Sequence, residues 1–395
     1  MSRKLIITGL IILISFSCTS NKVKEADAGM DGTGVADADA DADGDGDADA
    51  DADGSPDASA DGGCKWRKMY EATGDISALY DIWGSDPDNI FAVGFFSPVD
   101  PLDDAVYTVI LHYNGISWND MKVAEMMNLD SIWGINDQCI FASGSDLTEM
   151  LKYDGEQWKT ISSNQMQTRD IWGSSENDIY AVGNDWDYNY DAGTLDRTGS
   201  IFHYDGVEWT RIYDGGMIPA GIWGSSSNDV YVVGQRSIKM EDVPGEVILH
   251  YDGHEWTEIE TEDYRYSVDI WGFSASDVFV VNNNVSSPVD FIDSTVRHYD
   301  GNEWAVLKEG IPEAMEKISG SSGDNIYVTG RAVDSDSGAP QDYVTYHYDG
   351  YLWNRVELDA PWEILRIWTC SKDEAFAVAR NVNSKISLIL HYSCE

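Results

Sequence analysis

The chain has 395 residues, with 25 Lys and Arg against 70 Asp and Glu, so its formal net charge is −45. A field this negative repels phosphate backbones, and we therefore exclude nucleic acid as an expected partner. Hydrophobic residues make up 43% of the chain, including 15 Trp and 21 Tyr, which is enough to build a large core and is unlike a wholly disordered protein.

The first 18 residues have the pattern of an export signal. Arg3 and Lys4 precede an apolar run over residues 5–16, which is shorter than the roughly 20 residues that a membrane-spanning helix needs. The run ends in Ser15-Phe16-Ser17-Cys18, which resembles the lipobox of bacterial lipoproteins. The resemblance implies that residues 1–18 are a lipoprotein signal segment and that Cys18 is lipidated. It also implies a lipid-anchored protein of the cell envelope, at the outer membrane; an ordinary cleaved secretory signal is the alternative.

Residues 19–63 are dominated by Asp, Ala and Gly. From Asp37 to Asp53 an Asp stands at every second position. Such a segment buries too little apolar surface to offset its ordering entropy, and its like charges repel, so we expect a disordered acidic linker. Residues 39–44 and 49–54 also resemble the first half of Asp-rich calcium loops, but each lacks the closing Glu, which favours the solvated linker.

Residues 64–395 form a sevenfold repeat built around Ile-Trp-Gly. Near-copies of this motif, two of them decayed, have their Ile at Ile82, Ile132, Ile171, Ile222, Ile270, Ile318 and Ile367. In each unit a polar turn and a β-branched and aromatic strand follow the motif. A third strand comes next, then an Asp-Gly turn and a strand that begins with Trp. Four short strands in each of seven units predict an all-β, seven-bladed β-propeller.

The seventh unit is split between the two ends of the repeat array. His391-Tyr392 stands near the C-terminus and Trp66 near the start of the array; joined, they restore the hairpin of the other units. We therefore expect the N-terminal strand to complete the last blade and close the ring. Cys64 and Cys394 lie on the two halves of this hairpin, so we expect a disulfide between them in an oxidising compartment. We expect Cys139 and Cys370 to stay free.

The hairpin motif Tyr-Asp-Gly-x-x-Trp resembles the repeats of bacterial Asp-box or sialidase-like propellers. It occurs at Tyr153, Tyr204, Tyr251, Tyr299 and Tyr348, without the leading Ser of the Asp-box. The resemblance covers residues 64–395 and makes a sialidase-like glycoside hydrolase the enzymatic alternative. Such a site needs three Arg and a Tyr–Glu pair, and Arg236, Arg331 and Arg380 are available after second strands. Six of the seven His occupy the same repeat position, so we expect them to be structural and not catalytic.

Two Trp are not explained by the repeat and mark the candidate ligand site. They are Trp186, in a variable segment over residues 184–200, and Trp362, before the seventh unit. Trp186 alternates with Tyr188 and Tyr190, and flat aromatic faces suit sugar rings. Because binding residues tend to lie on variable loops held by a rigid frame, we expect these aromatic residues on the face that carries the variable loops. Packing of the aromatics over the blades is the alternative.

The same segment contains a possible calcium site. Asp185, Asp187 and Asn189 occupy positions one, three and five of a twelve-residue loop that ends at Asp196, but Tyr190 stands where such loops carry Gly.

The function expected from these observations is a non-catalytic binding or interaction module, with glycans or envelope proteins as ligands. The sialidase-like hydrolase is the first alternative, and a purely structural component of the envelope is the second. We expect a monomer that needs no cofactor, with calcium as the one candidate ion. No motif in the sequence identifies the ligand.

Overall fold

The structure, a computed structural model, describes residues 63–72, 78–96, 107–123, 128–144, 149–162, 167–189, 194–236, 245–259, 265–284, 293–333 and 340–394. Residues Cys64–Cys394 form one compact unit. The expected signal segment, the acidic linker, Cys18 and Tyr190 lie outside the described residues. Within the described part, no helix is long and apolar enough to cross a membrane.

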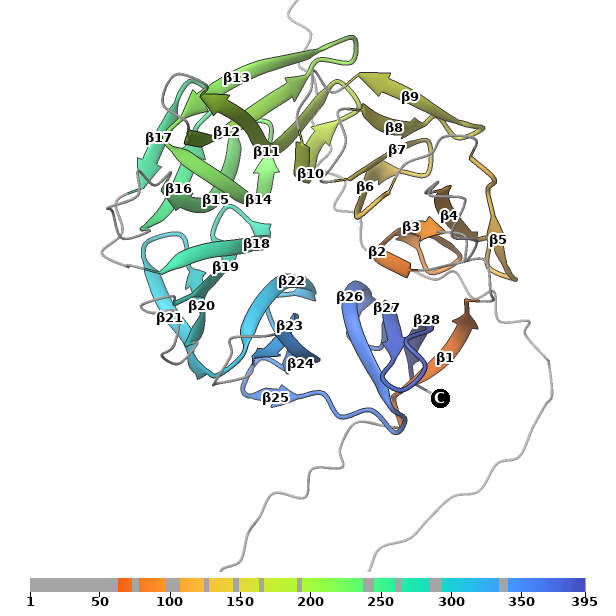
Figure 1. Cartoon of the computed structure of the whole chain (residues 1–395). Helices are drawn as coiled ribbons and strands as arrows, with labels where there is room; N and C mark the ends of the chain where they lie inside the picture. The colour runs from red at the N-terminus through yellow and green to blue at the C-terminus, as the bar shows by residue number, and fades with distance from the viewer. Residues whose placement is uncertain are drawn as a thin grey trace, which may run out of the picture. The chain divides into compact units, whose positions relative to one another are not determined.

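The described residues form seven four-stranded antiparallel sheets, which Figure 1 shows as blades arranged in a ring. Blade 1 consists of β2 (Ala78–Asp86), β3 (Asn89–Phe96), β4 (Tyr107–Tyr113) and β5 (Trp118–Asp120). Blade 2 consists of β6 (Ser131–Asn136), β7 (Cys139–Ser143), β8 (Glu149–Tyr153) and β9 (Trp158–Ser162). Blade 3 consists of β10 (Gln167–Ser175), β11 (Asp178–Asn189), β12 (Thr194–Tyr204) and β13 (Trp209–Gly215). Blade 4 consists of β14 (Met217–Ser226), β15 (Asp229–Arg236), β16 (Glu246–Tyr251) and β17 (Trp256–Ile259). Blade 5 consists of β18 (Tyr266–Ser274), β19 (Asp277–Asn283), β20 (Ser294–Tyr299) and β21 (Trp304–Ile311). Blade 6 consists of β22 (Ala314–Ser322), β23 (Asn325–Val333), β24 (Pro340–Tyr348) and β25 (Trp353–Arg355). Blade 7 is β26 (Trp362–Ser371), β27 (Glu374–Asn381), β28 (Ser387–Ser393) and β1 (Lys65–Glu71). The predicted seven-bladed β-propeller is confirmed.

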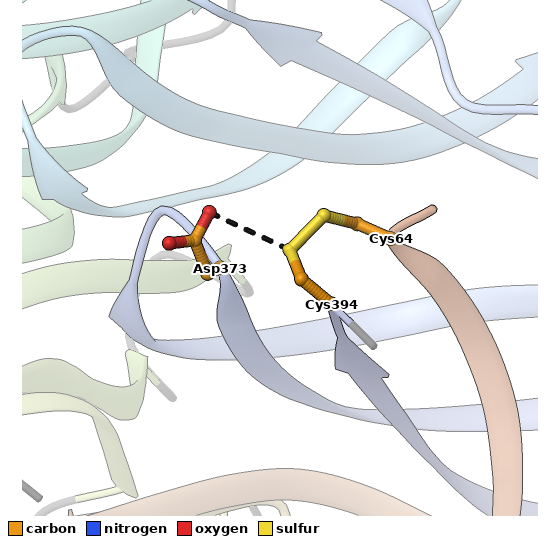
Figure 2. Close-up of side chains that lie close together, drawn as sticks. All are labelled: Cys64, Asp373 and Cys394. Atoms are coloured by element: carbon orange, nitrogen blue, oxygen red, sulfur yellow. Dashed lines mark hydrogen bonds between the residues drawn. A yellow bond between two sulfur atoms is a disulfide. The ribbon is translucent and has the colours of Figure 1, made fainter. Parts of the chain in front are cut away.

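The ring closes through blade 7, as the split hairpin predicts. β1 pairs antiparallel with β28, with Trp66 opposite Tyr392. Beside this pair Cys64 and Cys394 form the expected disulfide, which links positions 330 residues apart. Figure 2 shows Asp373 next to it, with a carboxylate oxygen 3.5 Å from the Cys394 sulfur. Because both sulfurs are used in the S–S bond, this cluster closes the ring and does not offer thiolates to a metal ion.

The two remaining cysteines of the array differ from each other. Cys139 is a buried free thiol, as expected. Cys370, which we also expected to be free, is disulfide-bonded, and its partner lies outside the described residues. The prediction was wrong because position within the repeat carries no information about a partner elsewhere in the chain.

The Ile-Trp-Gly motif is explained by packing between neighbouring blades. A Cβ added at Gly134 would lie 2.8 Å from the Trp83 ring of the preceding blade, and one at Gly224 would lie 2.7 Å from Trp172. The Trp of one blade therefore rests on the Gly of the next, which leaves no room for a side chain there. Contact of this kind, repeated around the ring, buries large aromatic surfaces and fixes the spacing of the blades.

The repeat histidines are structural, as expected. His250 bonds Asp229 at 2.7 Å and stacks on Tyr231, with ring centroids 4.3 Å apart. Equivalent pairs tie the third strand to the start of the second in the other blades with a described His. Burial raises the pKa of Asp229, but the hydrogen bonds from His250 and Ser225 outweigh it, and the pKa is lowered.

The variable segment 184–200 differs from the expected loop. β11 and β12 continue past the blade as an antiparallel hairpin whose pairing runs to Asn189 opposite Thr194. The alternation of aromatic and polar residues from 185 to 189 has the period of two that strands require. The sequence prediction treated this segment as a loop because it varies among the repeat units, and such variation does not exclude paired strands.

Candidate functional site at the axial mouth

The first strand of each blade lies nearest the axis of the ring (Figure 1), and in every blade except blade 2 it carries a bulge just before the repeat Ile. The register shifts between Leu79 and Asp81 in β2, and at the same position in β10, β14, β18, β22 and β26. A bulge adds one residue and re-aims its neighbours. We call the residues directly before each Ile the inner ring: Asp81, Ser131, Asp170, Gly221, Asp269, Lys317 and Arg366. We call those one position earlier the bulge ring: Tyr80, Asp130, Arg169, Ala220, Val268, Glu316 and Leu365.

The inner ring has an acid in every second blade over its first five members. Asp170 accepts hydrogen bonds from its own Ile171 amide, at 3.0 Å, and from the Ile222 amide of the next blade, at 2.9 Å. Asp81 and Asp269 reach the next blade in the same way. Each of these carboxylates therefore ties its blade to its neighbour at the axis and satisfies a backbone donor that would otherwise be unpaired.

Two bases, Lys317 and Arg366, complete the inner ring. The Lys317 ammonium lies 3.4 Å from the Asp269 carboxylate. Burial lowers the pKa of Lys317, but Asp269 and Asp170 outweigh burial, and the pKa is raised. Burial together with Asp269 raises the pKa of Asp170 to about 6, against the opposing effect of Lys317. The axis thus holds charged groups whose protonation is coupled.

A cavity of about 590 Å³ opens above the inner ring. Gln235 at the end of β15 and Ala314 at the start of β22 line it, so it lies on the face where second strands end and first strands begin. This face also carries the blade-to-blade connections, and we call the cavity the axial mouth. A second cavity of about 160 Å³ continues below it between the repeat Ile and Trp residues.

Charged residues of both signs converge at the axial mouth. Its charged lining residues are the bases Arg169, Lys317, Arg331 and Arg366 and the acids Asp81, Asp130 and Glu316. Four bases against three acids contrast with 25 against 70 in the whole chain. The mouth is therefore the place where the strongly negative field of the protein is locally offset.

The bases at the mouth are held by neighbouring acids and one aromatic ring. Glu316 lies 2.8 Å from Arg331 and 3.7 Å from Arg366. The Tyr343 ring carries the Arg331 guanidinium 4.6 Å from its centroid and the Arg380 guanidinium at 4.9 Å. Groups held this way lose little conformational freedom when they bind a ligand.

Blade 5 contributes a polar wall in place of the glycine found in most blades. In blades 1 and 6 this position of the second strand is Gly94 and Gly330. A Cβ there would lie 1.9 Å and 2.3 Å, respectively, from a backbone oxygen of the first strand. Blade 5 has Asn282 there, which donates to the buried Glu246 and, at 3.1 Å, to Ser267. Ser267 lines the mouth, so a buried network fixes this wall.

The residues predicted from sequence fall mostly outside the mouth. Arg331 lines it, whereas Arg236 pairs with Glu258 of the outer strand β17 and Arg380 pairs with Glu363. Trp362 opens β26 and lines a separate cavity. The backbone of Asp185, Trp186, Asp187, Tyr188, Asn189 and Asp196 lies in the β11–β12 hairpin, and their side chains are outside the described part.

The hairpin gives the calcium prediction no support. Asp185 and Asn189 are four steps apart along an extended strand, which is roughly 13 Å at about 3.3 Å per residue. Ligands of one calcium ion lie within about 2.6 Å of it, and a twelve-residue calcium loop must curl around the ion.

Sequence reasoning missed both rings at the axis. The available signal was the variation of the residue before each repeat Ile, where Asp, Ser, Gly, Lys and Arg replace one another while Ile itself is retained. A core position would keep one kind of residue, so this variation in an otherwise regular repeat marks positions that packing does not dictate.

Comparison with known proteins identifies the fold and no closer relationship. No family model and no curated protein matches the chain. The structure is similar to YCF48 bound to D1 peptide, at 12% identity and a TM-score of 0.55 over 84% of this chain and 95% of that chain. It is also similar to the WD40 repeats of RRP9, at 9% and 0.54 over 84% and 98%. A GH74 xyloglucanase from Xanthomonas campestris matches at 10% and 0.51 over 81% and 54%. At these identities the likeness shows that the chain shares the β-propeller fold.

Proposed function

We propose that the protein is an exported, lipid-anchored binding module that holds an extended segment of polypeptide at the axial mouth. The convergence of bases, acids and amide side chains around one cavity of about 590 Å³ carries the proposal. Ligand sites are usually concave and contain a few fixed polar groups that set orientation. The mouth has this composition, on a frame closed by paired strands.

A polypeptide suits this lining because its backbone presents donors and acceptors at short intervals. Carbonyl oxygens match Arg331, Arg366 and Lys317, and amide N–H groups match Glu316. The likeness to YCF48 bound to D1 peptide supports the proposal, because that neighbour is a propeller with a peptide ligand.

A sialidase-like hydrolase remains the second candidate, because Arg169, Arg331 and Arg366 line the same cavity. A sialidase also needs a tyrosine that ionises readily beside a Glu. Among the described residues Tyr266 and Glu316 line this cavity, whereas Tyr80 and Tyr343, whose pKa is raised by burial, do not. Turnover of a fluorogenic sialoside that is lost in Arg331→Ala would favour the hydrolase; no turnover favours the binding module.

The peptide proposal is tested with an immobilised array of extended peptides of varied sequence. Arg331→Ala should weaken capture by about tenfold, which corresponds to about 1.4 kcal/mol. Arg236→Ala is the control, because Arg236 lies one position beyond the blade-4 equivalent of Arg331, outside the lining of the mouth, and pairs with Glu258 on the outer strand. Equal loss in both variants, or capture of glycans and of no peptide, would contradict the proposal.

The anchor is proposed from the lipobox-like Cys18 and is tested separately. Labelled palmitate should enter the wild type and not Cys18→Ser. Cys18 is the only cysteine of the chain left to pair with the disulfide-bonded Cys370, and a thioether at Cys18 excludes that bond. Lipidation of Cys18 therefore competes with this disulfide, and non-reducing peptide mapping decides between the two. Recovery of Cys18 in a disulfide with Cys370, or equal labelling of both proteins, would contradict lipidation.

A further inference from the structure

A separate cavity of about 180 Å³ lies between blades 6 and 7. Its wall includes Tyr343 and Thr345 of β24, Arg355 of β25, and Trp362 and Glu363 of β26, and Ala360 borders it from the connection between these blades. The volume is several times the roughly 30 Å³ that one water molecule occupies in the liquid. We call this cavity the Glu363 pocket.

Glu363 is the chemically unusual residue of this pocket. Its side chain is 3% exposed, and one carboxylate oxygen, Oε2, accepts a 2.6 Å hydrogen bond from the Arg380 Nε. The other oxygen, Oε1, is buried and has no hydrogen-bond partner among the described residues. An unpaired buried acceptor costs about 1–3 kcal/mol. Because Glu363 lines the pocket, this oxygen is the acceptor that the carboxylate has left for a ligand there.

The charge around the pocket favours a positively charged ligand group. Arg355 lies 3.6 Å from Glu313 and 3.8 Å from Glu357, and Arg380 pairs with Glu363. Two bases therefore face three acids, which leaves a net charge of −1 within a chain whose formal charge is −45. A carboxylate that lacks one donor in such surroundings fits an ammonium group, which has three donors and no acceptor.

The pocket is connected to the axial mouth through one aromatic ring. Tyr343 lines the Glu363 pocket, and its ring lies between Arg331, which lines the mouth, and Arg380, which bonds Glu363. Trp362, unexplained by the repeat, lines the same pocket and offers an aromatic face to the stem or head of a cationic side chain.

We propose that the Glu363 pocket binds the side-chain ammonium of a lysine in the polypeptide held at the mouth. The ammonium donates to Glu363 Oε1, and the aliphatic stem lies along Trp362. The proposal rests on the proposed function for the identity of the ligand. The recognition of a primary ammonium by the pocket is independent of the mouth.

The test uses the peptide acetyl-Gly-Lys-Gly-amide, the same peptide with norleucine in place of Lys, and glucosamine, each titrated by ligand-observed NMR. We expect saturable binding of the Lys peptide and at least about tenfold weaker binding of the norleucine peptide. Binding of glucosamine equal to or tighter than that of the Lys peptide would overturn the lysine assignment.

Two variants locate the binding. Glu363→Gln keeps an acceptor for Arg380 and replaces the free acceptor with a donor, so binding of the Lys peptide should fall about tenfold. Asp359→Asn is the control, because this exposed carboxylate lies on the same blade-to-blade connection but does not line the pocket, and the variant should bind within about twofold of wild type. If Glu363→Gln does not fold, Ala360→Leu fills the pocket instead and should abolish binding. Unchanged binding in either pocket variant overturns the proposal.

Failure of this inference is distinguishable from failure of the proposed function. If capture of array peptides depends on Arg331 but is equal for Lys and norleucine, the proposed function of the mouth stands and the pocket proposal fails. If binding of short Lys peptides depends on Glu363 while Arg331→Ala has no effect on capture by the array, the pocket proposal stands and the proposed function of the mouth fails.

Discussion

Replacing Asp170 with Asn should remove much of the pH dependence of stability between pH 4 and pH 6. Burial raises the pKa of Asp170 from its ordinary value of 3.8 to about 6 in the folded protein. In this window the native state therefore binds more protons than the unfolded state, and stability falls as the pH rises. The contribution of Asp170 is favourable below about pH 4 and is lost once the pH exceeds about 6.

The size of the effect can be worked out from the pKa shift. About two pKa units correspond to about 3 kcal/mol at about 1.36 kcal/mol per unit, which is an upper limit. Asn accepts through a single oxygen, so one of the two backbone amides held by Asp170 loses its partner, which costs about 1–3 kcal/mol at every pH. The variant should therefore be less stable than wild type at pH 4 and close to it at pH 7.

Urea unfolding followed by Trp fluorescence, at half-unit steps from pH 4 to pH 7.5, gives the free energy of unfolding of both proteins. Asp300→Asn is the control: Asp300 lies in an exposed turn, and its pKa is lowered by the backbone amides of Glu303 and Asn302. It should leave the slope between pH 4 and 6 unchanged. If Asp170→Asn retains the wild-type slope, the assignment of a raised pKa at the axis is wrong.

Three further predictions concern the frame. Cys394→Ser should lower the free energy of unfolding by up to about 6 kcal/mol, the chain-entropy value for a loop of 330 residues; a melting temperature equal to that of the oxidised wild type would contradict it. Gly134→Ala should destabilise by about 1–3 kcal/mol in calorimetry, because its Cβ would lie 2.8 Å from the Trp83 ring, whereas Gly216→Ala has open space and should change little. Calcium should leave the melting temperature unchanged, because the β11–β12 hairpin is extended; a saturable calcium-dependent rise would show otherwise.

The fold could be predicted from sequence because the repeat specifies it many times. Seven Ile-centred strands and five Tyr-Asp-Gly-x-x-Trp hairpins all predict the same kind of four-stranded blade. An error in one unit therefore does not change the predicted fold. The closure was predictable for a different reason: Trp66 and Tyr392 are the two halves of a motif that is whole elsewhere.

The candidate site could not be predicted by the same route. Lys317 and Arg366 are in neighbouring blades but far apart in sequence, and their proximity depends on a bulge that no residue type indicates. The aromatic residues Trp186 and Trp362 stand out in the sequence instead, because the repeat does not explain them. Trp362 does line a cavity, but its importance comes from the orphaned oxygen of Glu363, which only three-dimensional contacts reveal.

Seven is an odd number, and an alternating pattern cannot close evenly on a ring of seven blades. Acids of the inner ring occupy blades 1, 3 and 5. If this alternation continued to blade 7, acids would stand in the adjacent blades 7 and 1. The chain places Lys317 and Arg366 at that seam. A ring of near-identical blades would accept a ligand in seven equivalent rotations, whereas the seam distinguishes one sector, that of blades 6 and 7. The Glu363 pocket lies in this sector, so the mismatch of parity would give the proposed ligand a single orientation on a nearly symmetric frame.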